Sequence, residues 1–182
     1  HLHSTASDGT DAPKELVGKA VSLGLSAIAL TDHDTLAGIP EARVAARELD
    51  IELVPGCELS TNTPFGEIHL LAFWPAETEE ALAALAVQEQ NRHFRNMQIL
   101  ERLADLGINI SDEELLEEAR GDIVGRPHIA SILLRQGTVR STAEAFARYL
   151  GRDGAAFVPR QLLTPLEGLR LLQSFNAVTA VA

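Results

Sequence analysis

The chain has 182 residues, of which 46% are hydrophobic and 23% charged, and its formal net charge is −11. This composition suits a globular protein with a buried core, and no apolar run is long enough to span a membrane. The acidic balance argues against a broad basic surface for duplex DNA, so any nucleic-acid substrate must be held locally. The single cysteine, Cys57, excludes an internal disulfide and is expected to be a small buried hydrophobe in a cytoplasmic protein.

Strand-like and helix-like segments alternate through residues 1–74. A helix is expected from about Pro13, with Asp11 as its N-cap and Gly24 as its end. The remaining elements are, in order, a strand at 25–30, a helix at 38–49, and strands at 51–54 and 68–71. Such alternation predicts parallel βαβ units.

Residues 75–160 are predicted to be helical, and a helix at 166–175 and a strand at 177–182 follow. One helix of the helical block is expected at 81–90. A second, ended by Gly107, carries an apolar stripe expected in a core: Phe94, Met97, Leu100, Leu103 and Leu106. Along one side of the second helix lie Arg92, Arg95 and Arg102. A solvated face is the preferred interpretation of these arginines, and contact with a phosphate is the alternative.

Potential metal ligands gather in the first 69 residues: His1, His3, Asp8, His33, Glu58 and His69. Two of the histidines are two residues apart, so on an extended segment both imidazoles point to the same side. Any one histidine alone would more often be a core or surface residue. Because ligand-type side chains at the carboxyl ends of parallel strands meet at one edge of an α/β barrel, we expect a divalent metal site.

Three further positions are candidates for roles around this site. Asp32 and Asp34 flank His33, and either could orient an imidazole or cap the helix that follows. Gly125-Arg126-Pro127 indicates a loop entering a helix, where a guanidinium beside the helix N-terminus is suited to a phosphate.

These motifs resemble the PHP family, the polymerase and histidinol phosphatase superfamily of metal-dependent phosphoesterases. His1-Leu2-His3-Ser4-Thr5 with Ser7-Asp8-Gly9 is similar to its first motif, Thr31-Asp32-His33-Asp34-Thr35 to its second, and Glu58 and His69 to its next two ligands. Within the family, the chain most resembles the branch that acts on nucleoside 3',5'-bisphosphates and trims RNA from the 5' end. The segments that carry this second resemblance are Gly125-Arg126-Pro127-His128, Tyr149-Leu150-Gly151 and Phe157-Val158-Pro159.

The resemblance implies an α/β fold, a distorted (β/α)7 TIM-like PHP barrel with an inserted helical cap domain. Residues 1–74 would be the N-terminal part of the metal-binding barrel, 75–160 the cap domain and 161–182 the return to the barrel. The family completes its metal sites with a His-Pro-Gly segment and a final Asp-x-His, which this sequence lacks. We therefore expect the 182 residues to be a fragment of a longer protein.

The resemblance also assigns two or three divalent ions to the ligands, with manganese favoured and zinc or iron as alternatives. His1, His3 and Glu58 would bind one ion, Asp8 and His33 a second, and Glu58 with His69 a third. Arg126 would bind a substrate phosphate. His128 would bind substrate or pass a proton to the leaving group, and Asp34 is the weaker candidate for that proton transfer.

The expected reaction is hydrolysis of the 5'-phosphate of a nucleoside 3',5'-bisphosphate by metal-bound hydroxide, with 5'-3' exoribonuclease activity on short RNA at the same site. The expected partners are a small phosphorylated nucleotide or a short single-stranded RNA end, with neither membrane nor duplex DNA. One alternative is a phosphatase of a small metabolite such as histidinol phosphate, against which the long helical insertion argues. Another is a noncatalytic PHP scaffold, against which the filled ligand positions argue. An amidohydrolase-type barrel uses similar ligands but usually also a lysine that bridges the metals. It is disfavoured because the only lysines, Lys14 and Lys19, lie on the first helix.

Overall fold

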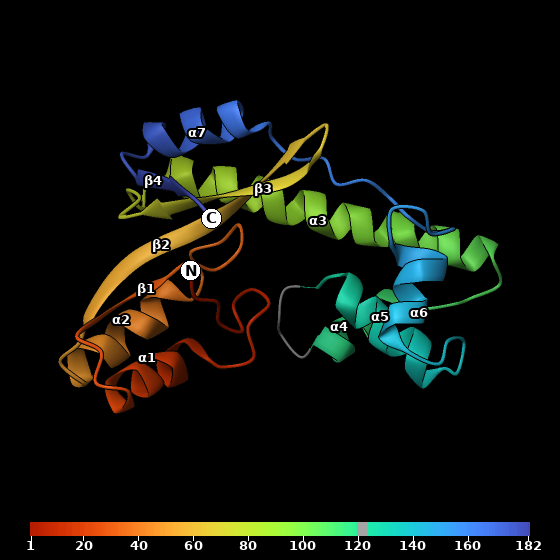
Figure 1. Ribbon diagram of the computed structural model, residues 1–182, viewed down its shortest axis with the longest axis horizontal. Helices are drawn as coiled ribbons and strands as arrows, with labels where there is room; N and C mark the ends of the chain where they lie inside the picture. Colours follow the sequence, from red (N-terminus) through yellow and green to blue (C-terminus); the bar gives the residue numbers. More distant parts are fainter. Residues whose placement is uncertain (120–123) are drawn as a thin grey trace. The chain divides into compact units, whose positions relative to one another are not determined.

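The computed structural model describes residues 1–119 and 124–182, which divide into two compact units (Figure 1). Unit 1 contains residues 1–89 and 162–182, and unit 2 contains residues 90–161. The long helix α3, Glu79–Asp105, gives its first part to unit 1 and the remainder to unit 2. The interpretation of residues 75–160 as a cap domain stays a prediction.

Unit 1 is built on a four-stranded sheet with the order β1-β2-β3-β4. Strands β1 (Ala27–Leu30) and β2 (Glu52–Thr63) are parallel, whereas β3 (Gly66–Phe73) pairs antiparallel with both β2 and β4 (Val178–Val181). Parallel pairing was expected throughout, and it is wrong for β2 and β3 because the short turn between them leaves no room for a crossover. The α/β class is confirmed, but this sheet does not confirm a complete (β/α)7 barrel.

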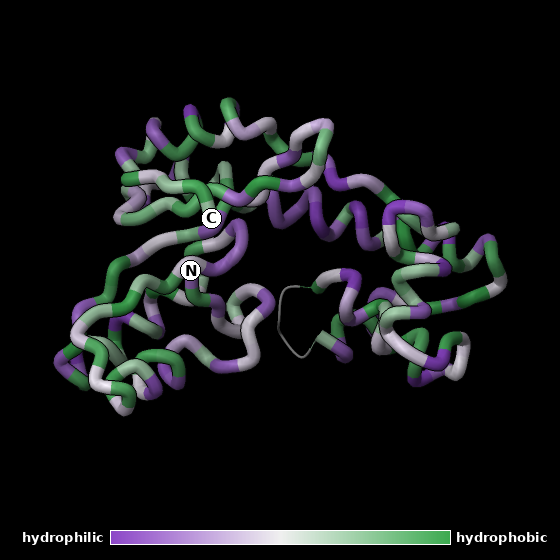
Figure 2. The backbone as a smooth tube through the Cα atoms, viewed as in Figure 1, coloured by the Kyte–Doolittle hydropathy of each residue, from purple (hydrophilic) through white to green (hydrophobic). Residues whose placement is uncertain are grey.

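Three helices accompany the sheet in unit 1: α1 (Pro13–Ser22), α2 (Ile39–Glu48) and α7 (Pro165–Ser174). Each has a proline at its first or second position, where the missing N–H costs no hydrogen bond. Helix α7 begins with a capping box between Thr164 and Glu167, and hydrophilic and hydrophobic segments alternate along it (Figure 2). The expected N-cap of α1 is wrong: Ala12 holds that position, and the Asp11 carboxylate lies 2.6 Å from Lys19 Nζ.

The two faces of the β2–β3 pair differ in chemistry. Cys57 and Leu59 of β2, with Leu70 and Ala72 of β3, belong to the hydrophobic core of unit 1. Since strand side chains alternate, Glu58 points to the opposite face. Cys57 is 1% exposed and burial raises its pKa to about 12, so its expected role as a buried hydrophobe is confirmed.

Unit 2 is helical. It contains the C-terminal part of α3, then α4 (Asp112–Ala119), α5 (Arg126–Arg135), α6 (Thr142–Ala145) and the π-helical turn η1 (Phe146–Leu150). These elements pack around a second core, whose fully buried side chains include Ile99, Leu103, Leu115, Ile129, Ile132, Leu133 and Leu150. None of the helices in the described part of the chain is long and apolar enough to cross a membrane.

Two expectations about α3 are corrected. The helix is continuous rather than two helices, and Phe94 and Leu106 of the expected stripe are 60% and 50% exposed. A three-residue step falls about 60° short of a full helical turn, so five such positions drift too far around the helix to share one buried face.

The solvated-face interpretation of the α3 arginines is wrong for Arg95. This side chain is 7% exposed, and its Nε donates a hydrogen bond to the Val158 carbonyl at 2.8 Å. Arg102 is exposed and donates to the carbonyl of Phe157. These two arginines therefore link α3 to residues 157–158 within unit 2.

Candidate metal centre

The six side chains expected to be metal ligands all lie in unit 1. They form three groups, and within each group the potential ligand atoms lie within 4.8 Å of one another. The groups are His1, His3 and Glu58; His3, Asp8 and His33; and His33, Glu58 and His69. The structure thus brings together residues from the N-terminal segment, from the loop after β1 and from strands β2 and β3.

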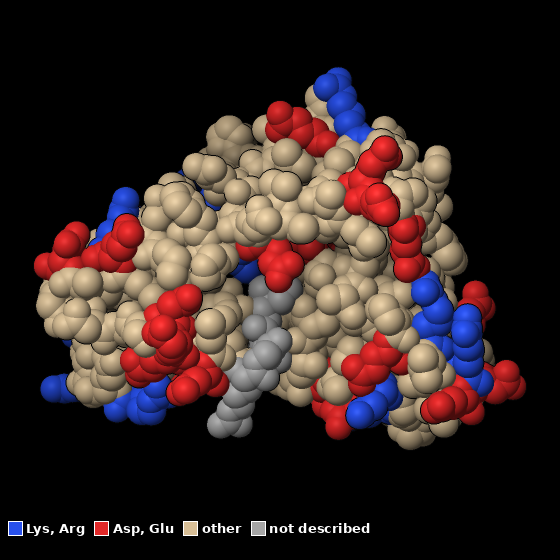
Figure 3. Space-filling view, turned by 180° about the vertical axis from the view of Figure 1, so that it is seen from behind, with Lys and Arg blue, Asp and Glu red and all other residues tan. Residues whose placement is uncertain are grey.

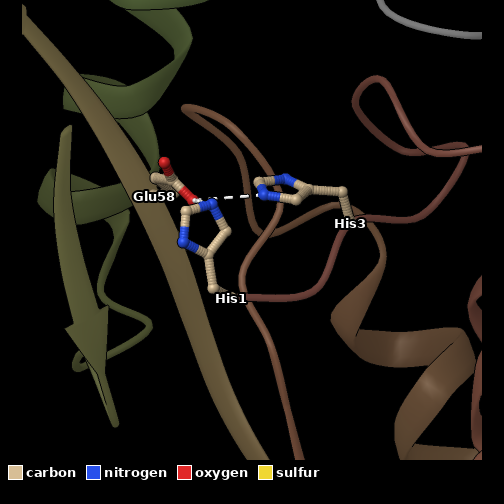
Figure 4. A group of neighbouring side chains, drawn as sticks. All are labelled: His1, His3 and Glu58. Carbon is tan, nitrogen blue, oxygen red and sulfur yellow. Dashed lines mark ion pairs between the residues drawn. The ribbon is translucent and has the colours of Figure 1, made fainter. Parts of the chain in front are cut away.

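Glu58 is the shared carboxylate of the cluster and is completely buried. Its Oε2 lies 2.8 Å from His1 Nε2 and 3.1 Å from His3 Nε2, and Figure 4 shows the two imidazoles directed at this carboxylate. Its other oxygen, Oε1, lies 2.7 Å from His69 Nδ1. One buried carboxylate therefore contacts three histidines.

Asp8 extends the cluster on its exposed side. Its two carboxylate oxygens lie 3.6 Å from His3 Nδ1 and 3.7 Å from His33 Nε2. The His3 and His33 rings stack with their centroids 4.4 Å apart, and the His69 ring meets His33 edge-on at 4.9 Å. The three groups therefore form one cluster, because neighbouring groups share His3, His33 or Glu58.

The register of the antiparallel strands explains how Glu58 and His69 meet. Glu58 pairs with Leu71, and Ser60 pairs with His69. Directly paired residues share a face, so Glu58 and His69 are diagonal neighbours on that face. Glu58 also forms a parallel bridge with His33 beyond the end of the β1–β2 ladder, as expected for a ligand at the end of parallel strands. The same expectation is wrong for His69, because β3 pairs antiparallel with both of its neighbours.

Two buried nitrogens of the cluster, His3 Nδ1 and His33 Nδ1, have no hydrogen-bond partner among the described residues. Glu58 Oε2 likewise accepts no hydrogen bond there, although His1 Nε2 and His3 Nε2 lie 2.8 and 3.1 Å from it. Each such atom costs about 1–3 kcal/mol unless a ligand satisfies it. Imidazole nitrogens and carboxylate oxygens are the donors that zinc, manganese and iron accept. The residues present therefore fit divalent cations.

The protonation of two histidines is set by their surroundings. Burial lowers the pKa of His33, which favours the neutral imidazole that a cation requires. The Glu67 carboxylate, and after it that of Glu58, raises the pKa of His69. Glu67 Oε2 lies 3.7 Å from His69 Nε2. Sequence reasoning missed Glu67, although its place two residues before His69 on a strand puts both side chains on one face.

A pocket of about 450 Å³ opens on this cluster. It is lined by His1, His33, Glu58, Glu67, Ile68, His69, Val181 and Ala182. The ligand-type side chains give it a polar wall, and Ile68 and Val181 give it an apolar one.

Asp34 is 2% exposed, and its two oxygens accept hydrogen bonds from the backbone N–H and the hydroxyl of Ser60. Neither Asp34 nor Asp32 caps α2, whose N-cap is Gly38 and has no side-chain cap. Proton transfer by Asp34 stays a prediction.

Arg126 and His128 lie in unit 2, in the first turn of α5. An Arg126 N–H donates to the Leu150 carbonyl at 3.1 Å, and the guanidinium lies 5.6 Å from the centroid of the Phe146 ring. His128 Nδ1 accepts the Gly125 N–H at 3.1 Å. The roles of Arg126 and His128 toward a substrate stay predictions.

The fold and the cluster define a class of protein: an α/β chain whose clustered histidines and carboxylates suit a centre of divalent cations. Residues 1–157 match the family model of the PHP domain. The chain belongs to the PHP domain family, in agreement with the resemblance of its motifs.

Two curated relatives and one solved structure show which proteins it is similar to. It is 41% identical over 183 residues to the 5'-3' exoribonuclease of Haemophilus influenzae, covering 100% of this chain and 66% of that protein. It is 30% identical over 163 residues to the 3',5'-nucleoside bisphosphate phosphatase of Chromobacterium violaceum, covering 88% of this chain and 57% of that protein. A crystal structure from Bifidobacterium adolescentis, assigned as a metal-dependent phosphoesterase, matches with a TM-score of 0.86 at 29% identity, over 100% of this chain and 64% of that one. The chain thus spans 57 to 66% of the length of these three proteins.

Proposed function

We propose that the protein is a metal-dependent phosphoesterase that hydrolyses the 5'-phosphate of nucleoside 3',5'-bisphosphates and also removes nucleotides from the 5' end of short RNA. The observation that carries the proposal is the buried Glu58 carboxylate, which meets three histidines at 2.7–3.1 Å. Membership of the PHP family supports phosphoester hydrolysis. The names of the two curated relatives support the substrate class.

The three groups of the cluster would hold two or three divalent cations, with manganese favoured over zinc or iron. His1, His3 and Glu58 would hold one ion, Asp8 and His33 a second, and Glu58 with His69 a third. When bound, the ions would supply Lewis-acid chemistry, which activates water and offsets the charge of a phosphoryl group. Glu58 would be shared between two of the ions.

The residues of the chain supply the remaining functions. The polar wall of the pocket would orient the phosphoryl group, and Ile68 and Val181 would offer apolar contact to the rest of the substrate. Small or end-bound substrates suit a pocket of about 450 Å³.

Arg126 is proposed to bind a phosphate group of the substrate, because its planar guanidinium and the N-terminus of α5 both favour anions. His128 is proposed to donate a proton to the leaving oxygen. Since its Nδ1 accepts the Gly125 N–H, the neutral ring carries its proton on Nε2, where it can be donated.

The test is phosphate release from adenosine 3',5'-bisphosphate by the intact protein with Mn²⁺, compared with 5'-phosphorylated oligoribonucleotides. His33→Ala should reduce kcat/KM by at least about 100-fold, because it removes a ligand. Arg126→Ala should raise KM by about 10- to 100-fold, because a charge-assisted hydrogen bond contributes about 1.5–3 kcal/mol.

The matched controls are His93→Ala and Arg152→Ala, two exposed residues of unit 2 that should leave both constants unchanged. If no phosphate or nucleotide is released while the ions are demonstrably bound, this substrate class is excluded. A small-metabolite phosphatase or a noncatalytic scaffold would then explain the cluster better.

A further inference from the structure

Two buried carboxylates that are not among the six ligands flank His33. Asp32 and Asp34 are each 2% exposed, although aspartate is almost never this buried without partners. Both lie in the turn that carries His33, which is the only ligand between the N-terminal segment and β2. Their backbone groups both bond to Glu58, whose N–H donates to the Asp32 carbonyl at 3.0 Å and whose carbonyl accepts the Asp34 N–H at 3.1 Å. Their side-chain hydrogen bonds, in contrast, run in two different directions.

Asp32 binds the N-terminal segment. Its Oδ1 accepts hydrogen bonds from the Ser4 N–H and the Ser7 hydroxyl, both at 2.6 Å, and its Oδ2 accepts the Ser4 hydroxyl at 2.8 Å. Both serines are completely buried. They lie between His3 and Asp8 in the sequence, so this loop clamp (Asp32, Ser4 and Ser7) fixes the segment that carries the N-terminal ligands.

Asp34 binds strand β2. Its Oδ1 accepts the Ser60 N–H at 2.7 Å and its Oδ2 accepts the Ser60 hydroxyl at 3.0 Å. Ser60 is two residues from Glu58 and pairs directly with His69. This strand clamp (Asp34 and Ser60) therefore fixes both strand-borne ligands. Asp34 adopts a φ of +57°, a conformation that is uncommon outside glycine and that marks a position held by its surroundings.

Gly38 supports the loop clamp by its lack of a side chain. A Cβ on Gly38 would lie 2.7 Å from Asp32 Oδ2 and 3.1 Å from the Ser4 hydroxyl oxygen. The φ of Gly38 is −76°, which any residue adopts. Alanine here would thus disturb the clamp by contact alone, without removing a polar group.

We propose that Asp32 and Asp34 are positioning residues that assemble the metal centre from separate segments, each fixing a different part of it to His33. This inference rests on the proposed metal centre. Loss of the loop clamp would disturb the two groups that contain His3 and leave His33, Glu58 and His69 in place. Loss of the strand clamp would disturb the two groups that contain Glu58 and leave His3, Asp8 and His33 in place.

The test is calorimetric titration of the metal-free intact protein with Mn²⁺. Asp32→Ala and Asp34→Asn should each weaken part of the binding by about 10- to 100-fold and leave part of it unchanged. The milder variants Ser7→Ala, Ser60→Ala and Gly38→Ala should act in the same direction, so the test holds even where an aspartate variant fails to fold. Asp11→Asn and Gly18→Ala are the controls, since Asp11 pairs with Lys19 on the surface and a Cβ on Gly18 meets nothing within 4 Å.

Second substitutions identify the binding that remains. His69→Ala should abolish the remaining Mn²⁺ binding of Asp32→Ala, and Asp8→Ala should abolish that of Asp34→Asn. Asp8→Ala added to Asp32→Ala, and His69→Ala added to Asp34→Asn, should each leave the remaining Mn²⁺ binding in place. If the second substitutions have the same effect whichever clamp was removed, the two clamps do not fix different ligand groups and the proposal is overturned.

Thermal unfolding with and without Mn²⁺ separates positioning from a structural role. Positioning predicts that the rise in Tm caused by Mn²⁺ shrinks in the clamp variants. A Tm lowered equally with and without Mn²⁺, at unchanged Mn²⁺ affinity, would overturn the inference while the proposed function stands. If the unsubstituted protein binds no Mn²⁺, Zn²⁺ or Fe²⁺, the proposed metal centre itself is overturned.

Discussion

The two units of the molecule carry their charges differently. The whole net charge of −11 belongs to unit 1, because unit 2 contains equal numbers of acidic and basic residues. Both lysines lie in unit 1, and unit 2 contains arginines but no lysine. Figure 3 shows basic side chains next to acidic ones on the face it draws, rather than in one continuous patch.

The net charge of each unit therefore does not show which of its charged side chains are available to bind ligands. The excess of carboxylates in unit 1 includes the buried Glu58, which faces three histidines and suits cations. Arginines of unit 2 also have partners within that unit: Arg95 donates to the Val158 carbonyl, and Arg135 forms ion pairs with Glu114 and Glu118. A count of arginines alone would therefore overstate the anion-binding surface of unit 2.

The largest expected effect comes from Glu58→Gln in unit 1. Glutamine keeps the shape of the side chain but removes the negative charge that two of the three ligand groups share. We expect Mn²⁺ affinity to fall by more than about 100-fold and phosphate release to be lost. Titration with Mn²⁺ measures the first effect, and Glu52→Gln, an exposed position on the same strand, is the control. Unchanged affinity would contradict the central place of Glu58.

A core substitution in unit 2 should separate stability from metal binding. Leu133 is completely buried in the second core, so Leu133→Ala should lower the free energy of unfolding by about 2–5 kcal/mol. Denaturant unfolding measures the loss, and Leu134→Ala, at a neighbouring residue that is 41% exposed, should cost much less. Mn²⁺ affinity below the unfolding transition should not change. A large loss of Mn²⁺ affinity would show that metal binding in unit 1 depends on the core packing of unit 2.

The smallest expected effect concerns Glu118 in unit 2. The Ser131 hydroxyl, and after it Arg135, lowers the pKa of this carboxyl below its ordinary value of 4.5. A lowered pKa in the folded state means that the contribution is present above the unfolded value and is lost as the pH falls through the folded one. Glu118→Gln should therefore slightly reduce stability at neutral pH and flatten its acid dependence below about pH 4.5. Urea midpoints between pH 3 and 7 would show this, and an unchanged slope would exclude it.

The sequence predicted the chemistry of the candidate site better than its geometry. The spacing of His1 and His3 and the order of the other four ligands were sufficient to select a set that the structure brings together. The antiparallel turn after β2 was not foreseen, because hydrophobic runs give strand positions but not pairing direction. Pro64-Phe65-Gly66 was the available signal, since a connection this short excludes a crossover.

The errors in the helices have equally simple causes. The expected stripe from Phe94 to Leu106 used three-residue steps alone, and the resulting drift carries its two ends to solvent. Residue type alone favours Asp11 as the N-cap, whereas in the structure its carboxylate pairs with Lys19 and Ala12 is the N-cap. The hydrogen bonds of Asp32 and Asp34 depend on segments far apart in the sequence, so no local pattern could assign them.

Helix α3 contributes side chains to both hydrophobic cores, so its local unfolding depends on both units. Its early turns contribute Ala81 and Leu85 to the first core, and its later turns contribute Ile99 and Leu103 to the second. A helix frays from the point where its packing is lost, because each amide bonds to a carbonyl four residues earlier. Amide protons near residues 89–90 should therefore exchange at the rate set by whichever unit opens first, and deuterium uptake there would report the weaker half of the protein.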